Sequence, residues 1–387
     1  MERFFLHILM DEKVVNSFIS MMEETYPDKS TYLIIAYEGK PKRVLPSEKV
    51  VSFDEGSEQL KHFLTKDVFA YKHVCLHSMV GKKFYTYIHH PSMSWVIWGF
   101  DLYGPLLWFK GYEVYYDEAQ QYKVRAGRKP VCLYKMLTML RDLKKARWQE
   151  QVIDRLGYFI TDNGCDEGVF NKYFGDKNIK FAGTINYYPI ENLIDPSEQN
   201  EVCKGNAIWV GNSAHPNGNH VWVFEKLKEF SDDIYIISPI SYGDARFMKY
   251  IDQEGRRLLG DRFVPLKDFL PVNEYYAKFL QANAFVFGHF RQCAVGNILM
   301  AFYFGGKVFL SNRNPLLPMY KDSGFNVYSI EEDLNEKFAI TPLDDNQRKK
   351  NRELVLSIAS YESSIEQLKN VFGKIRSDLQ QQVEHKR

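Results

Sequence analysis

Two glycine-containing segments in the second half of the chain carry residue types that bind phosphate groups. The first spans residues 210–213 with His220 nearby, and the second runs from Arg291 to Asn297. Each follows a predicted strand and opens a predicted helix, where glycine permits a tight turn and the free N–H groups of the helix attract anions. We therefore predict that the following residues hold a diphosphate: Gly211, Asn212, Ser213, His220, Arg291, Gln292, Gly296 and Asn297.

Both segments also have simpler explanations. The first can be an ordinary strand–loop–helix turn capped by Asn or Ser, and Arg291 can form a surface ion pair. The chain contains neither a G-x-G-x-x-G fingerprint nor a P-loop, which disfavours nucleotide sites of those two types. The stretch Val264–Phe269, at another predicted strand end, is where we expect a nucleobase to rest.

An aspartate in the first half is placed to act as a general base. Asp101 comes just after Gly99 at the end of a predicted strand, and a carboxylate there can take a proton from an acceptor hydroxyl. Trp95 and Trp98 precede it and Tyr103 follows it, so we predict that these aromatic residues bind the acceptor sugar. The alternative is a helix-capping aspartate among core tryptophans.

Two histidines end predicted strands of the same half. His7 lies at the end of the first strand and His77 at the end of the third. Because the carboxyl ends of parallel strands meet in one crevice, we predict His77 as a second catalytic group and His7 as an acceptor-binding residue. A structural role is the alternative for each. His89 and His90 lack partners with metal-ligand spacing, so we interpret them as surface residues that bind no metal.

A basic stretch follows the aromatic region. Residues 123–147 contain nine lysines and arginines against one acidic residue, Asp142, and apolar residues recur there at helical spacing. A helix with an apolar side and a basic side suits an anionic membrane surface, and a solvated helix packed on its own domain is the alternative. The net charge of the whole chain is only +1, which disfavours nucleic acid as a partner. The predicted membrane contacts are Lys135, Arg141, Lys144, Lys145 and Arg147.

Alternating strand and helix patterns position these residues. In the first half, short apolar runs predict strands at 4–9, 32–37, 74–77, 95–98 and 156–161. In the second half, the same alternation predicts strands at 207–210, 234–237, from 263, at 285–287 and at 308–310. Such alternation is typical of parallel sheets with helical crossovers. We therefore predict an α/β protein with two Rossmann-like, doubly wound domains that face each other across a cleft.

Chain length and a change in composition set the expected domain boundaries. A chain of 387 residues fits two domains, and residues 191–206 lack periodicity. We expect a first domain at 1–190, a linker at 191–206, a second domain at 207–365 and a terminal helix at 366–387 that can cross back to the first domain. Five scattered cysteines indicate reduced thiols, and no apolar stretch is long enough to span a membrane.

Several of these motifs, in the same order along the chain, resemble a known family. The chain resembles the bacterial 4-acetamido-4,6-dideoxygalactosyltransferases, also called TDP-N-acetylfucosamine:lipid II N-acetylfucosaminyltransferases, from about residue 4 to residue 335. The chain departs from the family after Asp101, after Ser213 and in its C-terminal extension. The shared motifs are W-x-x-W-G-x-D-L-Y at 95–103, V-G-N-S at 210–213 with His220, R-Q at 291–292 with Gly296, N-P at 314–315, and the strand-end His77.

This resemblance implies the GT-B fold and a metal-independent glycosyltransferase of the hexosyltransferase class. The donor would be a TDP- or UDP-sugar, carrying an acetamido-dideoxyhexose or a related hexose and bound mainly by the second domain. The acceptor would be a polyprenyl-diphosphate-linked saccharide of bacterial surface polysaccharide synthesis. The protein would then be peripheral, at the cytoplasmic face of the bacterial inner membrane. Two alternatives stay open: a GT-B-fold nucleotide-sugar epimerase and a non-catalytic membrane-peripheral scaffold.

Overall fold

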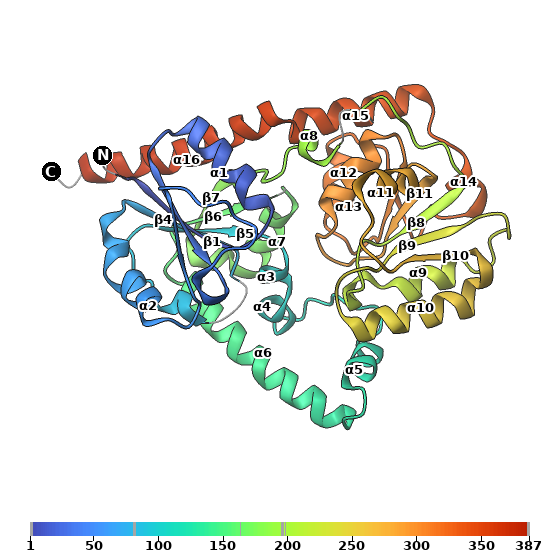
Figure 1. Ribbon diagram of the computed structural model, residues 1–387, viewed down its shortest axis with the longest axis horizontal. Helices are drawn as coiled ribbons and strands as arrows, with labels where there is room; N and C mark the ends of the chain where they lie inside the picture. Colours follow the sequence, from blue (N-terminus) through green and yellow to red (C-terminus); the bar gives the residue numbers. More distant parts are fainter. Residues whose placement is uncertain (1–2, 80–82, 163, 195–196, 198, 385–387) are drawn as a thin grey trace. The chain divides into compact units, whose positions relative to one another are not determined.

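The chain folds into two compact units. The computed structural model describes residues 3–79, 83–162, 164–194, 197 and 199–384. Unit 1 comprises Met1–Tyr112, Arg141–Pro189 and Ala359–Arg387, and unit 2 comprises Glu113–Leu140 and Ile190–Ile358. Figure 1 shows the strands of unit 1 in blue to green and those of unit 2 in yellow to orange.

The division of the chain differs from the expected one in several segments. Residues 113–140, which we placed in the first domain, belong to unit 2, and residues 359–365, which we placed in the second domain, belong to unit 1. Unit 2 also begins at Ile190 and so includes residues 191–206, which we expected to form a linker. The first difference matters for function, because the apolar part of the basic stretch is carried by the second unit.

Unit 1 is built on a parallel sheet of seven strands in the order β3-β2-β1-β4-β5-β6-β7. Strands β1 and β2 are almost entirely buried, because helices cover both faces of a parallel sheet and neither side can be polar. The strands are β1 (Phe5–Met10), β2 (Ser30–Ile35), β3 (Val50–Phe53), β4 (His73–His77), β5 (Met93–Ile97), β6 (Tyr158–Thr161) and β7 (Lys180–Thr184).

The terminal helix completes the core of unit 1. Helix α16 contacts α1 and β7, and Figure 1 shows it running beside both. Its buried residues Leu368, Phe372 and Ile375 recur every three to four positions and join the core around Phe5 and Phe18. The helices of this unit are α1 (Val14–Thr25), α2 (Glu58–Thr65), α3 (Phe100–Tyr103), α4 (Pro105–Trp108), α7 (Cys165–Phe174) and α16 (Tyr361–Glu384), with 3-10 helices η1 (Tyr37–Gly39), η2 (Asp67–Ala70), η3 (Lys83–Tyr87) and η4 (Gly175–Lys177).

Unit 2 is built on a second parallel sheet, of six strands in the order β10-β9-β8-β11-β12-β13. The two parallel-sheet α/β domains predicted from the sequence are therefore confirmed. The strands are β8 (Ala207–Val210), β9 (Ile236–Pro239), β10 (Phe263–Leu266), β11 (Ala282–Phe287), β12 (Lys307–Leu310) and β13 (Val327–Ser329).

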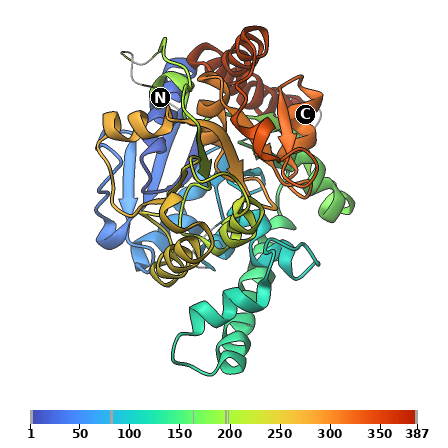
Figure 2. The same ribbon diagram turned by 90° about the vertical axis from the view of Figure 1, so that its right-hand side faces the viewer.

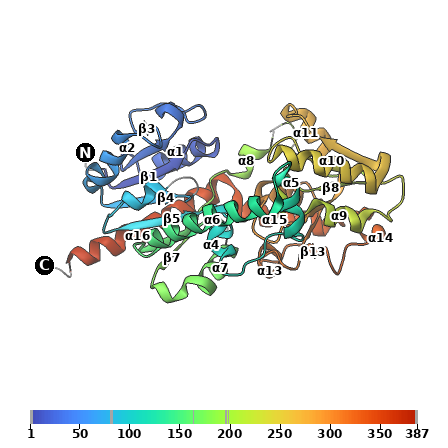
Figure 3. The same cartoon turned by 90° about the horizontal axis from the view of Figure 1, so that it is seen from below.

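Helices cover both faces of the second sheet. On one face α9 and α10 pack side by side, as Figure 3 shows, and bury Phe224 and Phe247 against the strands. On the other face the rings of Phe279 and Phe285 are 4.5 Å apart. The helices are α5 (Glu118–Ala126), α8 (Ile190–Leu193), α9 (His220–Leu227), α10 (Ala245–Leu259), α11 (Val272–Phe279), α12 (Val295–Tyr303), α13 (Leu316–Asp322), α14 (Glu336–Ile340) and α15 (Asp345–Ala359), with 3-10 helices η6 (Pro216–Gly218) and η7 (Gly260–Arg262).

One long helix belongs to both units. Helix α6 (Val131–Ile153) contributes residues 131–140 to unit 2 and its remaining residues to unit 1. Figure 2 shows α5 and the first turns of α6, in teal, lying outside the layers of unit 2. Among the described residues, none of the helices combines the length and the apolar character that a membrane crossing requires.

Candidate functional site

A pocket opens at the carboxyl ends of three neighbouring strands of unit 2. Its cavity of about 210 Å³ lies where β8, β9 and β10 end, which is where doubly wound sheets bind their ligands. Asn212 follows β8, Tyr242 follows β9, and Asn297 comes from the first turn of α12. The complete lining consists of Asn212, Pro239, Ser241, Tyr242, Leu266, Asp268, Phe269, Leu270, Tyr275 and Asn297.

Exposed aromatic rings form one wall of this pocket. The rings of Tyr242 and Phe269 are nearly parallel, at 17°, with centroids 6.3 Å apart. Phe269 is 79% exposed and Tyr242 45% exposed, although burial would be favourable for both side chains. An exposed apolar ring that lines a pocket is suited to stack on a planar ligand. Phe269 lies in the stretch where the sequence predicted a nucleobase, whereas Tyr242 and Tyr275 were missed.

The turn after β8 requires glycine for two reasons. Gly211 has φ +74°, a conformation that side-chain-bearing residues rarely adopt. A Cβ atom at this position would also lie only 2.3 Å from Nε2 of His220. The glycine therefore lets the imidazole of His220 lie directly against the backbone of the turn.

His220 opens α9 and is held in a buried position. Its side chain is 3% exposed, and Nε2 has no hydrogen-bond partner among the described residues. Burial lowers the pKa of His220 to about 3, helped by neighbouring His289 and His215, so the ring is neutral. A neutral buried imidazole without a partner at Nε2 can form a hydrogen bond with a ligand through that nitrogen.

A second histidine has similar properties and was not predicted. His289 follows β11 and is 1% exposed, and its Nδ1 lacks a partner within the described part of the chain. Burial, followed by the charge of Arg291, lowers the pKa of His289 to about 3. Sequence analysis could have found His289 from its position two residues after a strand, because His77 was selected for its position at a strand end.

The second glycine segment begins the helix that borders the pocket. Arg291 is 8% exposed, and its Nη1 donates to the carbonyl of Gln292 at 2.6 Å. Ala294, with φ +61°, precedes α12 without a capping side chain, so the first N–H groups of this helix have no side-chain acceptor from the cap. Gly296 lies in that first turn and Asn297 lines the pocket.

The predicted donor residues thus come from two loops of one sheet. Asn212 and Asn297 line the same pocket. Burial, followed by the charge of Arg291, lowers the pKa of His215, beside the first loop. Ser213 is an exception, because its buried hydroxyl already has a partner and donates to Oδ1 of Asn212 at 3.4 Å. We infer that Ser213 orients the amide of Asn212 and does not itself contact a ligand.

The structure argues against Asp101 as a general base. The side chain is fully buried, and its carboxylate accepts hydrogen bonds from the backbone N–H of Met79 at 3.0 Å, the backbone N–H of Trp98 at 3.0 Å and the indole of Trp95 at 2.7 Å. Burial raises the pKa of Asp101, and these three bonds oppose that rise. A carboxylate held in this way ties the first turn of α3 to Trp95 of β5 and to the backbone of Met79. Its role is therefore structural, although, among the described residues, no side chain caps α3 as the alternative had proposed.

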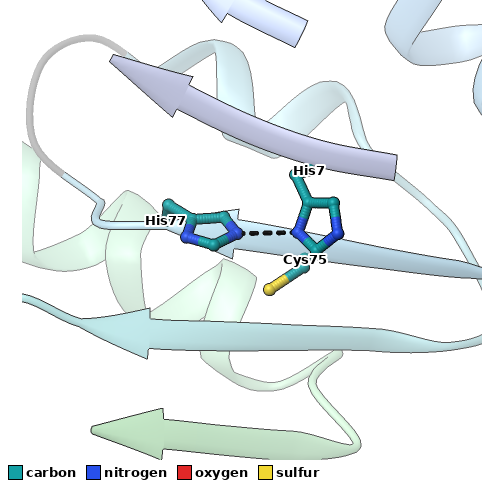
Figure 4. A group of neighbouring side chains, drawn as sticks. All are labelled: His7, Cys75 and His77. Carbon is teal, nitrogen blue, oxygen red and sulfur yellow. Dashed lines mark hydrogen bonds between the residues drawn. The ribbon is translucent and has the colours of Figure 1, made fainter. Parts of the chain in front are cut away.

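The two predicted histidines of unit 1 are also interior. Nδ1 of His7 and Nε2 of His77 are 2.9 Å apart in a hydrogen bond, shown in Figure 4, and the other ring nitrogen of His77 bonds the hydroxyl of Tyr187. Both histidines are 0% exposed, and burial lowers the pKa of His77 to about 3. The prediction that they contact a substrate is therefore corrected, because they form a neutral buried pair.

Cys75 lies beside this histidine pair, and together the three residues resemble a metal-ligand set. Their ligand atoms lie within 4.8 Å of one another (Figure 4). However, the nitrogens of His77 already have partners, and burial raises the pKa of the Cys75 thiol to about 12. A protonated thiol is a poor metal ligand, so core packing explains the group.

The predicted acceptor-binding aromatic residues are mostly interior as well. Trp95 and Tyr103 are 0% exposed, and the Tyr103 hydroxyl donates to Oδ1 of Asp166 at 2.5 Å. Trp98 is half-buried and packs edge-to-face on Tyr187. Neither Trp95 nor Tyr103 offers a surface to an acceptor sugar, so their assignment is corrected to core packing.

Comparison with solved structures places both units in one class of fold. The chain is similar to sucrose-phosphate synthase from Thermosynechococcus elongatus (10% identity, 97% of this chain and 100% of that chain covered, TM-score 0.61). It is also similar to alpha,alpha-trehalose 6-phosphate synthase from Burkholderia multivorans (8% identity, 100% of this chain and 99% of that chain covered, TM-score 0.62). A third similar structure is HepE from Anabaena, solved in complex with UDP (12% identity, 96% of this chain and 100% of that chain covered, TM-score 0.61). These likenesses confirm the predicted GT-B fold.

Sequence comparison gives a more specific result. The model of the family described as 4-alpha-L-fucosyltransferase, glycosyl transferase group 56, matches residues 168–362. This range includes β8 to β13 and hence the whole lining of the pocket in unit 2. None of the curated protein sequences matches the chain.

Proposed function

The chain belongs to the 4-alpha-L-fucosyltransferase family, glycosyl transferase group 56, and we propose that it transfers a sugar from a TDP- or UDP-sugar to a polyprenyl-diphosphate-linked saccharide. Its family and its GT-B fold make it a glycosyltransferase. The proposed sugar is an acetamido-dideoxyhexose or a related hexose, and the proposed pathway is bacterial surface polysaccharide synthesis.

The pocket of unit 2 carries this proposal. Its exposed Phe269 offers a face to a planar base, and Asn212 and Asn297 add polar side chains at the strand ends. A thymine or uracil ring fits that combination, because it has flat apolar faces and hydrogen-bonding edges. HepE, a structure of the same fold, was solved with UDP.

The diphosphate would lie beside the pocket, against the two glycine loops. There it would meet Nε2 of His220, the N-terminus of α12 and Arg291. These groups donate hydrogen bonds or carry positive charge, and in glycosyl transfer the departing nucleoside diphosphate gains negative charge. Fixed donors aimed at that developing charge are a large source of rate enhancement. This arrangement requires no metal or other cofactor, and we propose none.

On the acceptor side, the proposal rests on the family resemblance and on the basic stretch. A lipid-linked acceptor requires a peripheral enzyme at the cytoplasmic face of the bacterial inner membrane. Lys144 and Arg147 are exposed on α6 and can contact anionic headgroups, as can Arg141 and Lys135. Lys145 differs, because it is half-buried with its ammonium 5.4 Å from the centre of the Phe100 ring.

One experiment separates this function from its two rivals. Purified protein is incubated with a panel of TDP- and UDP-sugars, with and without a polyprenyl-diphosphate-linked saccharide, and released nucleoside diphosphate is measured. A transferase releases it faster when the acceptor is present, an epimerase converts the donor sugar without needing the acceptor, and a scaffold does neither. Acceptor-independent conversion of the donor, or no reaction with any donor, would remove the proposal.

A further inference from the structure

The first ten residues of α6 expose an unusual amount of apolar surface. Six large apolar side chains between residues 131 and 140 are 38–52% exposed. Few segments of a folded chain leave so many neighbouring apolar side chains in water, and patches of this kind mark binding surfaces. The six residues are Val131, Leu133, Met136, Leu137, Met139 and Leu140.

These side chains surround most of the helix and do not form a single stripe. At about 100° per residue, the six positions span roughly two thirds of the helix circumference. The remaining sector contains Thr138, which is buried, and Tyr134, whose ring contacts that of Tyr122 in α5 with centroids 6.5 Å apart. The sequence predicted an amphipathic helix with one apolar side, whereas exposed apolar side chains surround most of this part of α6. The charged residue among them is Lys135, which is exposed and whose ammonium lies 3.7 Å from Glu118 of α5.

Basic side chains lie at both ends of this apolar segment. Arg128 and Lys129 precede it and are exposed, and Arg141, Lys144 and Arg147 follow it and are exposed. Positive charges at both ends would repel a second copy of the same surface, whereas they complement an anionic one. An apolar segment between basic clusters therefore matches the interfacial region of a bilayer that contains anionic lipid.

We propose that residues 131–140 insert into the interfacial layer of an anionic membrane, with the flanking lysines and arginines at the level of the headgroups. Ten helical residues extend about 15 Å, well short of the roughly 20 residues needed to span a bilayer, so this segment lies in the interface. The inference rests on the lipid-linked acceptor proposed above and names the part of the chain that brings the enzyme to that acceptor.

The segment is firmly tied to the unit that holds the donor pocket. Nε of Arg125 in α5 is 3.0 Å from Asp244 at the start of α10, in an ion pair. The backbone N–H of Tyr116 donates to Oδ1 of Asn219 at 2.9 Å, and Asn219 directly precedes His220. Insertion of residues 131–140 would thus hold unit 2 itself at the membrane surface.

A thiol within the segment allows insertion to be observed directly. Cys132 is exposed, whereas Cys75, Cys165 and Cys203 are buried, so replacing half-buried Cys293 with serine leaves one reactive cysteine. An environment-sensitive fluorophore on Cys132 should shift to the blue with vesicles containing about 30% phosphatidylglycerol, and should not respond to pure phosphatidylcholine. An unchanged emission spectrum with the anionic vesicles would overturn the proposal.

Substitutions within the segment test which side chains insert. Met136→Ser, Leu137→Ser and Leu140→Ser remove exposed apolar groups, so each should weaken vesicle binding by roughly tenfold without affecting folding. Leu356→Ser is a matched control, because Leu356 is a 38% exposed leucine on another helix of unit 2 and should leave binding unchanged. The triple variant combines these three serine substitutions. Equal vesicle binding by this variant and the wild type, at the same melting temperature, would contradict insertion. A change from dimer to monomer without loss of vesicle binding would assign the surface to a second copy instead.

The same variants separate this inference from the proposed function. Transfer to a short-chain, water-soluble acceptor analogue should be unchanged in the triple variant, because residues 131–140 lie outside the donor pocket. Loss of transfer to acceptor in vesicles, with normal transfer to the soluble analogue, supports the insertion. Absence of transfer to either acceptor by the wild-type protein would instead refute the proposed function.

Discussion

Replacing Gly211 with alanine tests how the loop after β8 is built. The residue has φ +74°, which costs alanine about 1–2 kcal/mol. The new Cβ would lie 2.3 Å from Nε2 of His220, so the buried imidazole has to move, at about 1–3 kcal/mol for an overpacked site. Displacement of His220 removes a hydrogen bond to the charged diphosphate, which we expect to weaken TDP or UDP binding by roughly 10–100-fold.

A matched glycine separates backbone strain from the contact with His220. Gly260 in the same unit has φ +58°, and a Cβ there meets nothing within 4 Å. Gly260→Ala should therefore lower the melting temperature through backbone strain alone and leave nucleotide affinity, measured by calorimetry, unchanged. Gly211→Ala should lower both the melting temperature and the nucleotide affinity.

A double variant completes this test. Replacing His220 with alanine removes the atom that a Cβ at position 211 would meet, so Gly211→Ala should cost less stability in the His220→Ala protein than in the wild type. Nucleotide affinity should stay low in that double variant, since the imidazole is gone. Wild-type affinity in a folded Gly211→Ala protein would refute the placement of the diphosphate beside His220.

Four further changes have defined outcomes. Phe269→Ala should lower nucleotide affinity about tenfold in calorimetry, because the ring no longer stacks on the nucleobase. The melting temperature should not change, because this side chain is 79% exposed. Wild-type affinity would show that Phe269 does not contact the nucleobase. Asp101→Asn should lower the free energy of unfolding by about 2–4 kcal/mol in denaturant titrations, because an amide group then faces buried donors. Turnover per folded molecule should stay near wild type, and a selective loss of turnover would restore Asp101 as a general base. The pKa of His77 is about 3 in the folded protein against 6.5 normally, so the unfolded chain binds more protons than the folded protein below about pH 6.5. The free energy of unfolding should therefore fall by up to about 1.4 kcal/mol for each pH unit below 6.5. If a His77→Gln variant loses stability equally steeply with falling pH, this residue is not the cause. Binding of TDP or UDP against Nε2 of His220 should raise the pKa of this residue from about 3, so affinity should increase as the pH falls through the raised pKa toward about 3. His220→Gln should reduce that increase, and identical pH profiles would place the diphosphate elsewhere.

The predicted strands show where sequence patterns carry enough information. Strand β8 was predicted at its observed bounds, because a central parallel strand is buried on both faces and reads as a continuous apolar run. The strands missed were β3, β7 and β13, each at an edge of its sheet. Edge strands have one neighbour and are less completely buried, as β3 and β7 are here, so their sequence signal is weaker.

Domain membership of residues 113–140 depended on contacts that no local pattern contains. Arg313 pairs with Glu113 at 2.5 Å, and Arg125 pairs with Asp244 at 3.0 Å. The partners in each pair are far apart in the sequence, so the residues around either one do not reveal the other. Position along the chain alone suggested the wrong unit.

The candidate site shows a similar limit. Sequence position correctly identified strand ends, but a strand-end residue can point into the core or toward a ligand. Asn212 lines a pocket, whereas His77 and Asp101 are turned into buried hydrogen-bond networks. The three donors to Asp101 come from residues 79, 95 and 98, and their convergence is a property of the folded backbone.

Mass analysis of a lipid-linked acceptor tests the central claim most directly. The protein is incubated with a TDP- or UDP-sugar and a polyprenyl-diphosphate-linked saccharide, and the acceptor mass and the released nucleoside diphosphate are measured together. We predict an acceptor heavier by one glycosyl residue and one nucleoside diphosphate released for each residue added. At low donor concentration, Phe269→Ala should form both products about tenfold more slowly. An acceptor of unchanged mass with every donor of the panel would contradict the assignment of this chain as a transferase to lipid-linked saccharides.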